Sequence, residues 1–223
     1  MTIDLGFVKA FLIKGEKYIL IDTGVPKSFG RIERFMTDNG INPKNISVVI
    51  ITHNHLDHTG SLGKVKKLTG APVMIHKSED IYLSKGTTTP VQIRSLLPRL
   101  LMKIMKKPEI APFNADIIIK DSDIIDLKPY GVAGKIIHTP GHTDGSISVL
   151  LDSGQAVVGD LFSAKKAKQG TKANYPFIYN DLDAIKISMR KLINQGGKQF
   201  YNAHGVVCDK NALIKLLDKE NNK

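Results

Sequence analysis

Three histidines and an aspartate fall within six consecutive residues of this chain, in the sequence His53-Asn54-His55-Leu56-Asp57-His58. The chain has 223 residues and only seven histidines, so this short segment holds a large share of them. Imidazole nitrogens and carboxylate oxygens are the ligands that zinc and similar metals bind, at about 2.0–2.2 Å. A metal site explains such a cluster better than helix caps or surface polar groups do.

The spacing within the cluster predicts two metals. On an extended segment, residues two apart point to the same side, so His53 and His55 can bind a single ion. Asp57 and His58 come one turn further along, where the chain is expected to bend into a helix near residues 59–60. The second pair therefore diverges from the first and reaches a second, neighbouring position.

Three further residues of ligand type stand apart from this cluster, each after a predicted strand: His142, Asp160 and His204. A glycine stands beside each of them, which allows a close approach of the backbone to a neighbouring segment. Taken singly, a histidine or aspartate after a strand is more often a cap or turn residue. Two metals need more than four ligands, however, so together these residues predict one site assembled at strand ends.

The hydrophobic pattern predicts the elements that must position these residues. Apolar runs bounded by turn residues predict strands at 7–13, 17–21, 47–52, 73–76, 117–119, 132–138, 147–151, 156–159 and 199–203. Helical spacing predicts helices between 26 and 40 and at about 60–68, 182–195 and 209–220. Each half of the chain runs through strands, a helix and a polar loop at a strand end. This order favours two sheets packed face to face with helices outside.

Taken in order, five motifs resemble those of the metallo-β-lactamase fold superfamily of metallohydrolases. They are Asp22-Thr23-Gly24, His53-Asn54-His55-Leu56-Asp57-His58, His142, Asp160 and His204. The resemblance covers residues 7 to about 217. It implies an α/β fold, an αββα four-layer sandwich with two β-sheets face to face, helices outside and a dinuclear metal site along one edge. We therefore expect a single metallo-β-lactamase-like domain over residues 1–223, with a helical insert at about 85–115.

The resemblance also implies how the ligands divide between the two metals. The first metal would be bound by His53, His55 and His142, and the second by Asp57, His58 and His204, with Asp160 bridging both. Asp22 would lie behind the ligands and orient a ligand histidine. Asp57 and Asp160 are the expected catalytic residues, as ligands that position the attacking hydroxide. Residues 202–203 are Asn-Ala where the family often has Pro-Gly, which is a local departure before the last ligand.

The expected cofactors are two divalent metal ions, zinc first, with iron or manganese as the alternatives. A water polarised by two metals ionises near neutral pH, so the bridging hydroxide needs no serine or cysteine nucleophile. We expect a metal-dependent hydrolase that cleaves an ester, thioester or lactone bond of a small-molecule substrate. A phosphodiesterase or nuclease is the first alternative, and an iron-dependent oxygenase or redox protein the second. Asp160 stands where several antibiotic-degrading members have a cysteine, so antibiotic hydrolysis is not expected.

The formal net charge of +11 would by itself suit a nucleic-acid-binding protein. The 32 lysines and arginines are mostly scattered lysines, however, and the chain has no tryptophan. A solvated basic surface is therefore expected, with nucleic acid as the alternative partner. The sequence shows neither a signal-peptide pattern nor the ~18 unbroken apolar residues that a membrane span needs. The single cysteine, Cys208, suits a reducing compartment, so a cytoplasmic location is expected.

Residues 92–107 predict a basic amphipathic helix that Pro98 kinks or interrupts. Three interpretations remain open for it: an ordinary helix packed on the core, a cap over the metal edge, or a contact in a homodimer. A role at a membrane surface is the least favoured alternative, because the segment is internal. Two more histidines lie outside the five motifs. His76 is expected to be a polar residue at a strand end. His138 is expected to pack structurally, with support of the site from behind as the alternative.

Overall fold

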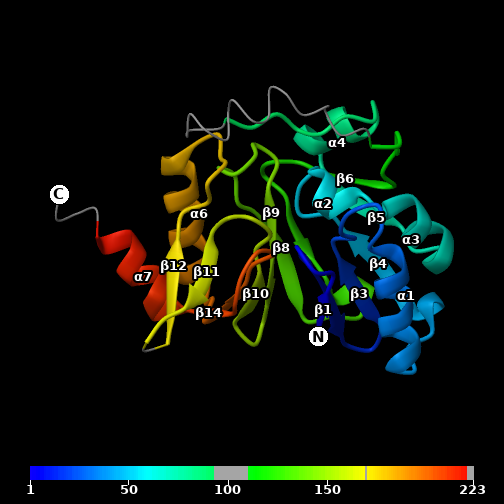
Figure 1. Ribbon diagram of the computed structural model, residues 1–223, viewed down its shortest axis with the longest axis horizontal. Coiled ribbons are helices and arrows are strands. Elements are labelled where there is room, and N and C mark those ends of the chain that lie inside the picture. The colour runs from blue at the N-terminus through cyan, green and yellow to red at the C-terminus, as the bar shows by residue number, and fades with distance from the viewer. Residues whose placement is uncertain (93–109, 169, 220–223) are drawn as a thin grey trace.

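The computed structural model describes residues 1–92, 110–168 and 170–219. Two six-stranded sheets and one two-stranded sheet form within these residues. In Figure 1 the two large sheets lie in the middle of the molecule, with helices on both outer sides. On one side are α1 (Phe29–Asp38) and α3 (Leu62–Thr69), and on the other are α6 (Leu182–Asn194) and α7 (Lys210–Asp218). This arrangement confirms the predicted αββα sandwich.

The first sheet contains the strands of the first half of the chain in sequence order. They are β1 (Thr2–Asp4), β2 (Lys9–Lys14), β3 (Tyr18–Ile21), β4 (Ile46–Ile50), β5 (Val73–His76) and β6 (Ile117–Ile119). The pairings from β1 to β3 are antiparallel, and those from β3 to β6 are parallel. Parallel strands are normally buried on both faces, which explains the continuous apolar run at the end of β4.

The second sheet has the order β14 (Cys208–Asp209), β13 (Gln199–Tyr201), β10 (Gln155–Val157), β9 (Ile147–Leu151), β8 (Gly134–His138) and β7 (Ile124–Asp126). β10 is parallel to β13, and β9 is antiparallel to both β8 and β10. The strands β8, β10 and β13 therefore point the same way and end at the same edge. The three predicted ligand loops of this half all leave that edge.

Three apolar layers fill the spaces between the four layers of the sandwich. One, which includes Ile32 and Val49, joins α1 and α3 to the first sheet. A second, which includes Ile50 and Val149, lies between the two sheets. The third, which includes Leu192, joins α6 and α7 to the second sheet. Burying apolar surface on both faces of both sheets holds the strand ends, and hence the loops that follow them, in fixed positions.

Most predicted elements are confirmed, and the missed ones are short or polar. The sequence pattern predicts neither β1 nor α2 (Leu56–Thr59) as a separate turn. It also misses α4 (Lys77–Leu83), β7, β11 (Ser163–Lys166), β12 (Thr171–Asn174), β14 and the 3-10 turns η1 (Pro43–Asn45) and η2 (Lys128–Tyr130). The hairpin of β11 and β12 is rich in lysine and exposed, so its pattern gives no strand signal. The helix predicted at 92–107 falls almost entirely outside the described residues, and its three interpretations remain predictions.

No helix within the described part of the chain is long and apolar enough to span a membrane.

Candidate metal centre

The cluster of the first half lies where the chain passes from β4 into α2. His53 and His55 stand in the linking segment, and the backbone of His55 is extended. Asp57 and His58 lie in the single turn of α2. The change from extended to helical backbone separates the two pairs in direction, as the spacing predicts. This edge of the first sheet faces the loops that follow β8, β10 and β13, which bring the other predicted ligands.

The first set, which comprises His53, His55 and His142, forms a tight group of ring nitrogens. Nε2 of His53 lies 3.0 Å from Nδ1 of His55, and Nε2 of His142 lies 3.1 Å from that same Nδ1. Ligands at 2.0–2.1 Å from a tetrahedral ion lie about 3.3 Å apart, so these separations suit one metal. The rings meet edge to face, at 84–86°, which lets their in-plane lone pairs converge.

The second set comprises Asp57, His58 and His204. Oδ2 of Asp57 lies 3.1 Å from Nε2 of His204 and 3.9 Å from Nε2 of His58. Asp160 lies between the two sets: its carboxylate is 3.4 Å from His204, 3.5 Å from His58 and 3.7 Å from Nε2 of His142. The structure thus brings all seven predicted ligand residues together, with Asp160 in contact with members of both sets.

Each histidine of the two sets has an acceptor for its outer ring nitrogen. The acceptors are the Thr52 hydroxyl for His53, the Thr89 carbonyl for His55, the Asp22 carboxylate for His58, the Ile178 carbonyl for His142 and the Phe7 carbonyl for His204. A carbonyl can only accept, so it fixes the N–H on the outer nitrogen. The inner nitrogen then keeps its lone pair for a metal, which is the usual arrangement around ligand histidines.

Asp22 occupies the position predicted for it, behind a ligand. Its Oδ2 lies 2.8 Å from Nδ1 of His58, and both side chains are fully buried. Its carboxylate also accepts from the backbone N–H and the hydroxyl of Thr52, each at 2.8 Å. Asp22 is the one non-glycine residue with a positive φ (61°) among the residues that the structure describes. Aspartate tolerates this left-handed conformation, and the network around it holds the side chain in place.

Two atoms in the centre test whether a cation fits. Nε2 of His58 and Oδ1 of Asp160 are buried and have no hydrogen-bond partner. Buried polar atoms are rarely left without a partner, because losing hydration without replacement is costly. The two atoms lie 3.5 Å from each other, and both are good ligands for a divalent ion of the zinc class. The residues present therefore fit a bound metal.

The first set holds neutral imidazoles. Burial lowers the pKa of His53 well below its usual value, helped by the neighbouring His58 and His55. Burial also lowers the pKa of His55, and it lowers that of His142 to about 4. Three histidines packed together in a dry site cannot all carry charge. At neutral pH the set therefore offers unprotonated nitrogens, which is what metal binding requires.

The second set is charged. Burial alone would lower the pKa of His58, but the carboxylates of Asp22, Asp160 and Asp57 raise it well above its usual value. Burial would also lower the pKa of His204, but its hydrogen bonds to Asp160 and Asp57 raise that pKa to about 10. Burial would raise the pKa of Asp57, yet His58 and His204 lower it to about 2. Without metal, these groups pair as ions.

One supporting residue, Glu79, carries no recognisable signal in the sequence. Glu79 of α4 is fully buried, and its Oε2 accepts from the Asn54 N–H and from the Thr89 hydroxyl, each at 2.7 Å. Its Oε1 accepts from the Gly145 N–H at 3.0 Å, in the loop that carries His142. Glu79 thus ties both loops of the first set together. Such a role depends on tertiary contacts, so only the unusual burial of a glutamate reveals it.

Glycines allow the ligand loops to pack closely. Gly159, which precedes Asp160, has φ +53°, and a Cβ there would lie 2.8 Å from Thr52 Oγ1. Gly141, which precedes His142, has φ +135°, and a Cβ there would lie 2.5 Å from the backbone nitrogen of Ile185 in α6. A side chain at either position would push a ligand loop away from its neighbour.

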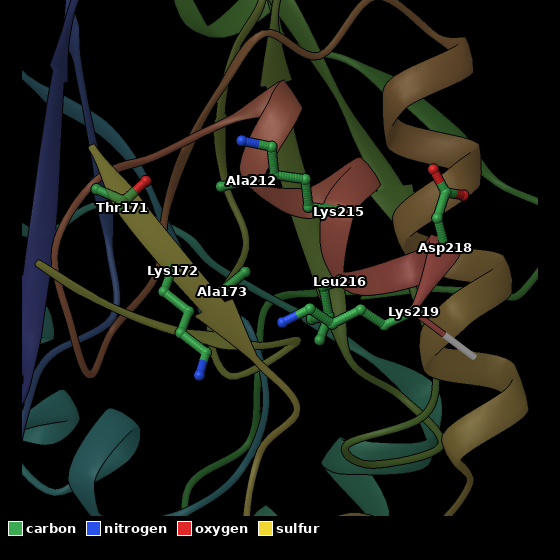
Figure 2. A pocket seen from close by; sticks show the side chains of 8 residues that line it. All are labelled: Thr171, Lys172, Ala173, Ala212, Lys215, Leu216, Asp218 and Lys219. Atoms are coloured by element: carbon green, nitrogen blue, oxygen red, sulfur yellow. The ribbon is translucent and has the colours of Figure 1, made fainter. Parts of the chain in front are cut away.

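A cavity of about 430 Å³ lies away from this centre, between β12 and α7 (Figure 2). Its lining residues are Thr171, Lys172, Ala173, Ala212, Lys215, Leu216, Asp218 and Lys219. None of the seven predicted metal ligands is among them. The cavity has three lysines and a single carboxylate, so it offers positive charge but no set of ligands for a cation.

The geometry of the centre agrees with the comparison to known families. The model of the metallo-beta-lactamase superfamily matches residues 3–192, which is most of the chain. The chain therefore belongs to the metallo-beta-lactamase superfamily, whose members typically bind divalent metals. This finding confirms the family that the five motifs indicated.

Individual relatives are consistent with a hydrolase. A probable metallo-hydrolase of Methanocaldococcus jannaschii is 34% identical over 155 residues, which cover 70% of this chain and 67% of that protein. A probable metallo-hydrolase of Bacillus subtilis is 26% identical, with 92% and 81% coverage. The chain spans only 54–62% of the uncharacterized mycobacterial relatives it also matches.

A solved structure of an archaeal metallo-beta-lactamase superfamily protein from Sulfolobus tokodaii has a TM-score of 0.64 to this chain at 21% identity, over 98% of this chain and 84% of that one. At this identity the likeness shows the shared fold.

Proposed function

We propose that this protein is a dinuclear metal-dependent hydrolase that cleaves an ester, thioester or lactone bond of a small substrate. One observation carries the proposal: seven ligand-type side chains converge in two sets that share Asp160. The relatives named probable metallo-hydrolases support the same class of reaction. The single cysteine is buried and free, which is consistent with the proposed cytoplasmic location.

The first set and Asp160 would hold one divalent ion, and Asp57, His58, His204 and Asp160 the other. The mixture of imidazole and carboxylate ligands favours zinc, with iron and manganese as alternatives. When bound, two such ions polarise a shared water and allow it to ionise near neutral pH. Because Asp57 and Asp160 neutralise only part of the charge of two divalent ions, the centre would retain net positive charge for an anionic transition state.

The exposure of the ligands indicates the side from which a substrate approaches. His53, His58 and His142 are buried and form the back of the centre. Asp57 and His204 are 22% and 24% exposed and form its mouth. Asp57 and His204 would therefore be the ligands nearest to a water or substrate that enters there.

The experiment that tests the proposal combines metal analysis with activity. Purified protein reconstituted with zinc, iron or manganese should bind two ions per chain in the centre. The same preparations should hydrolyse at least one of a panel of generic thioester, lactone and ester substrates. A fully loaded centre that cleaves phosphodiesters or RNA instead would promote the nuclease alternative, for which the net charge of +11 is the supporting observation. Oxygen consumption by an iron-loaded protein that lacks hydrolytic activity would promote the redox alternative.

A further inference from the structure

Three residues outside the centre form a second group of potential ligands, here called the peripheral cluster: His76, Asp121 and His138. His76 ends β5 and His138 ends β8, so the two histidines come from different sheets. Asp121 lies in the link between β6 and β7, which are the edge strands of those two sheets. The peripheral cluster therefore lies where the chain crosses from one sheet to the other.

We propose that the peripheral cluster is a separate binding site for one divalent transition-metal ion of the zinc class, which clamps the two sheets together beside the His142 loop. Two imidazoles and one carboxylate match the ligands of three-residue zinc sites that keep an open position for water. Asp121 is 55% exposed, so this open position faces solvent. The high share of imidazole disfavours magnesium and calcium.

The distances within the peripheral cluster support a site for one ion. Nε2 of His76 lies 3.2 Å from Oδ1 of Asp121, and Nδ1 of His138 lies 4.0 Å from the same oxygen. Two ligands of one tetrahedral ion lie about 3.3 Å apart, so His138 must move closer to Asp121. His76 is fully buried, yet its Nε2 has no hydrogen-bond partner of acceptable geometry. That atom is therefore an unsatisfied polar atom close to the Asp121 carboxylate.

The outer contacts also prepare His138 as a ligand. Its Nε2 lies 2.8 Å from the carbonyl oxygen of Asp144, which can only accept, so Nε2 carries the proton and Nδ1 is free. His76 remains neutral near pH 7, because burial and the neighbouring His138 lower its pKa to about 4. In this neutral ring Nδ1 accepts from the Ser78 N–H at 3.3 Å, so the proton lies on Nε2. A metal on Nε2 requires that proton to move to Nδ1, and the Ser78 contact is then lost. Ser78 lies in the first turn of α4, where backbone N–H groups lack helical partners anyway.

Two further features of the metal-free arrangement oppose binding and define what must change. The rings of His76 and His138 are stacked, with centroids 4.4 Å apart and planes at 6°. An imidazole lone pair lies in the ring plane, so one ring must turn. The His138 ring, 13% exposed, is the less buried of the two. Lys77 donates to Oδ2 of Asp121, which leaves Oδ1 for the metal but places a positive charge nearby. We therefore expect this site to bind more weakly than the centre and to fill last.

The consequence for function follows from the loop that the cluster touches. The Asp144 carbonyl belongs to the segment between β8 and β9 that carries His142. The N–H of Gly145 in the same segment donates a hydrogen bond to Glu79 of α4. A metal on the peripheral cluster would hold the start of α4 and the end of β8 at a fixed separation. It would thus stabilise the support of the first set without contacting it.

The test compares ion counts in full-length protein stripped of metal and titrated with zinc. Wild type should bind one ion more than Asp121→Asn or His138→Gln, whereas the matched control Asp123→Asn, in the same turn, should equal wild type. The variants that lose the weakest ion should also show a smaller rise in melting temperature at high zinc than wild type does. Lys77→Met should tighten that ion by at least about fivefold, because it removes a nearby positive charge.

The outcome is distinguishable from the fate of the proposed function. Equal ion counts and equal zinc-dependent melting shifts in wild type and Asp121→Asn would overturn the peripheral site, whatever the centre binds. Conversely, an Asp57→Ala/Asp160→Ala double variant should retain the weakest ion while it loses ions from the centre. Because Asp121 is exposed and its replacement is isosteric, misfolding is not expected to obscure the comparison, and His138→Gln provides the second variant.

Discussion

The two sets of the metal centre differ in how they hold protons when no metal is bound. The first set, His53, His55 and His142, consists of buried neutral imidazoles with lowered pKa values. In the second set, carboxylates raise the pKa of His58 and of His204. The first set can accept a cation without releasing protons, whereas a cation in the second set must displace them. The structure therefore predicts that the first set fills first, and that filling of the second set depends steeply on pH.

The largest expected effect comes from the residue that joins the two sets. Asp160→Asn removes a negative charge but keeps the shape of the side chain, so the fold should persist. Ligand positioning in both sets should fail, and the hydrolytic rate should fall by more than the ~100-fold typical of residues that only support a ligand. Asp57→Ala should have a similar effect, confined to the second set. Kinetics with the best substrate and a thermal melt check both variants.

The control for Asp160→Asn is Asp152→Asn. Asp152 is exposed in the turn after β9, so the variant makes the same chemical change far from the ligands. Near-normal hydrolysis by Asp160→Asn would contradict the shared role of this carboxylate. A loss of the cooperative melt would show instead that Asp160 is needed for folding.

The next effect concerns Asp22, which contacts His58 of the second set directly and reaches the first set only through the Thr52 hydroxyl. Asp22→Asn should keep a hydrogen bond to Nδ1 of His58 but remove the charge that makes this imidazole a stronger ligand. Metal affinity of the second set should fall by roughly 10–100-fold, while the first ion binds as in wild type. Zinc titrations of wild type and variant, fitted for two sites, measure the difference. An equal loss at both sites would refute the separation of the two sets.

Much of this centre could be predicted from sequence because its ligands are local in the chain or follow recognisable strands. Spacing alone identifies four of the ligands, His53, His55, Asp57 and His58. The apolar strands β8, β10 and β13 identify the loops that carry the other three. The roles of Glu79 and of the Thr89 carbonyl could not be predicted in this way. They depend on which loops meet in space, and a buried glutamate looks like a surface residue in a sequence. The hairpin of β11 and β12 could not be predicted for a related reason. Its exposed lysines obscure the alternating pattern of its buried alanines.

The peripheral cluster illustrates the same limit. His76 and His138 lie 62 positions apart in sequence, and each was expected to act alone. Only the crossing between the two sheets stacks them beside Asp121.

A smaller effect should appear in the pH dependence of stability of the metal-free protein. The raised pKa of His204 provides stability that is fully present below about pH 6.5 and is lost as pH rises toward 10. The lowered pKa of His142 provides stability that is present above about pH 6.5 and is lost as pH falls toward 4. The melting temperature should therefore peak near pH 6.5 and fall toward both pH 4 and pH 10.

The alkaline side of that profile depends on the second set, and the acidic side between pH 6.5 and 4 depends mainly on buried neutral histidines, which gives a direct test. His204→Gln should reduce the alkaline fall alone. His142→Gln should reduce only the acidic fall, and only in part, because His53, His55 and His76 also have lowered pKa values. If either variant flattened both sides equally, the two sets would titrate as one unit and the comparison would fail. Bound metal should remove most of the alkaline fall, because it replaces the protons on the second set.

The smallest effect is expected at the cavity between β12 and α7, which carries positive charge but no set of cation ligands. Lys172, Lys215 and Lys219 line it, and Lys172 stands directly opposite Lys165 in the β11–β12 pair. Like charges so placed repel, so neutralising Lys172, Lys215 and Lys219 with glutamine should not destabilise the fold and should change hydrolysis less than twofold. If the lysines are only a solvated surface, wild type should bind nucleic acid weakly, with affinity that falls steeply with salt, and the triple variant should differ little at 150 mM salt. Electrophoretic binding assays with single-stranded RNA over a range of salt concentrations measure both slopes. Tight wild-type binding that the triple variant loses, together with metal-dependent cleavage of that RNA, would instead make this surface part of a nuclease and reassign the substrate of the metal centre.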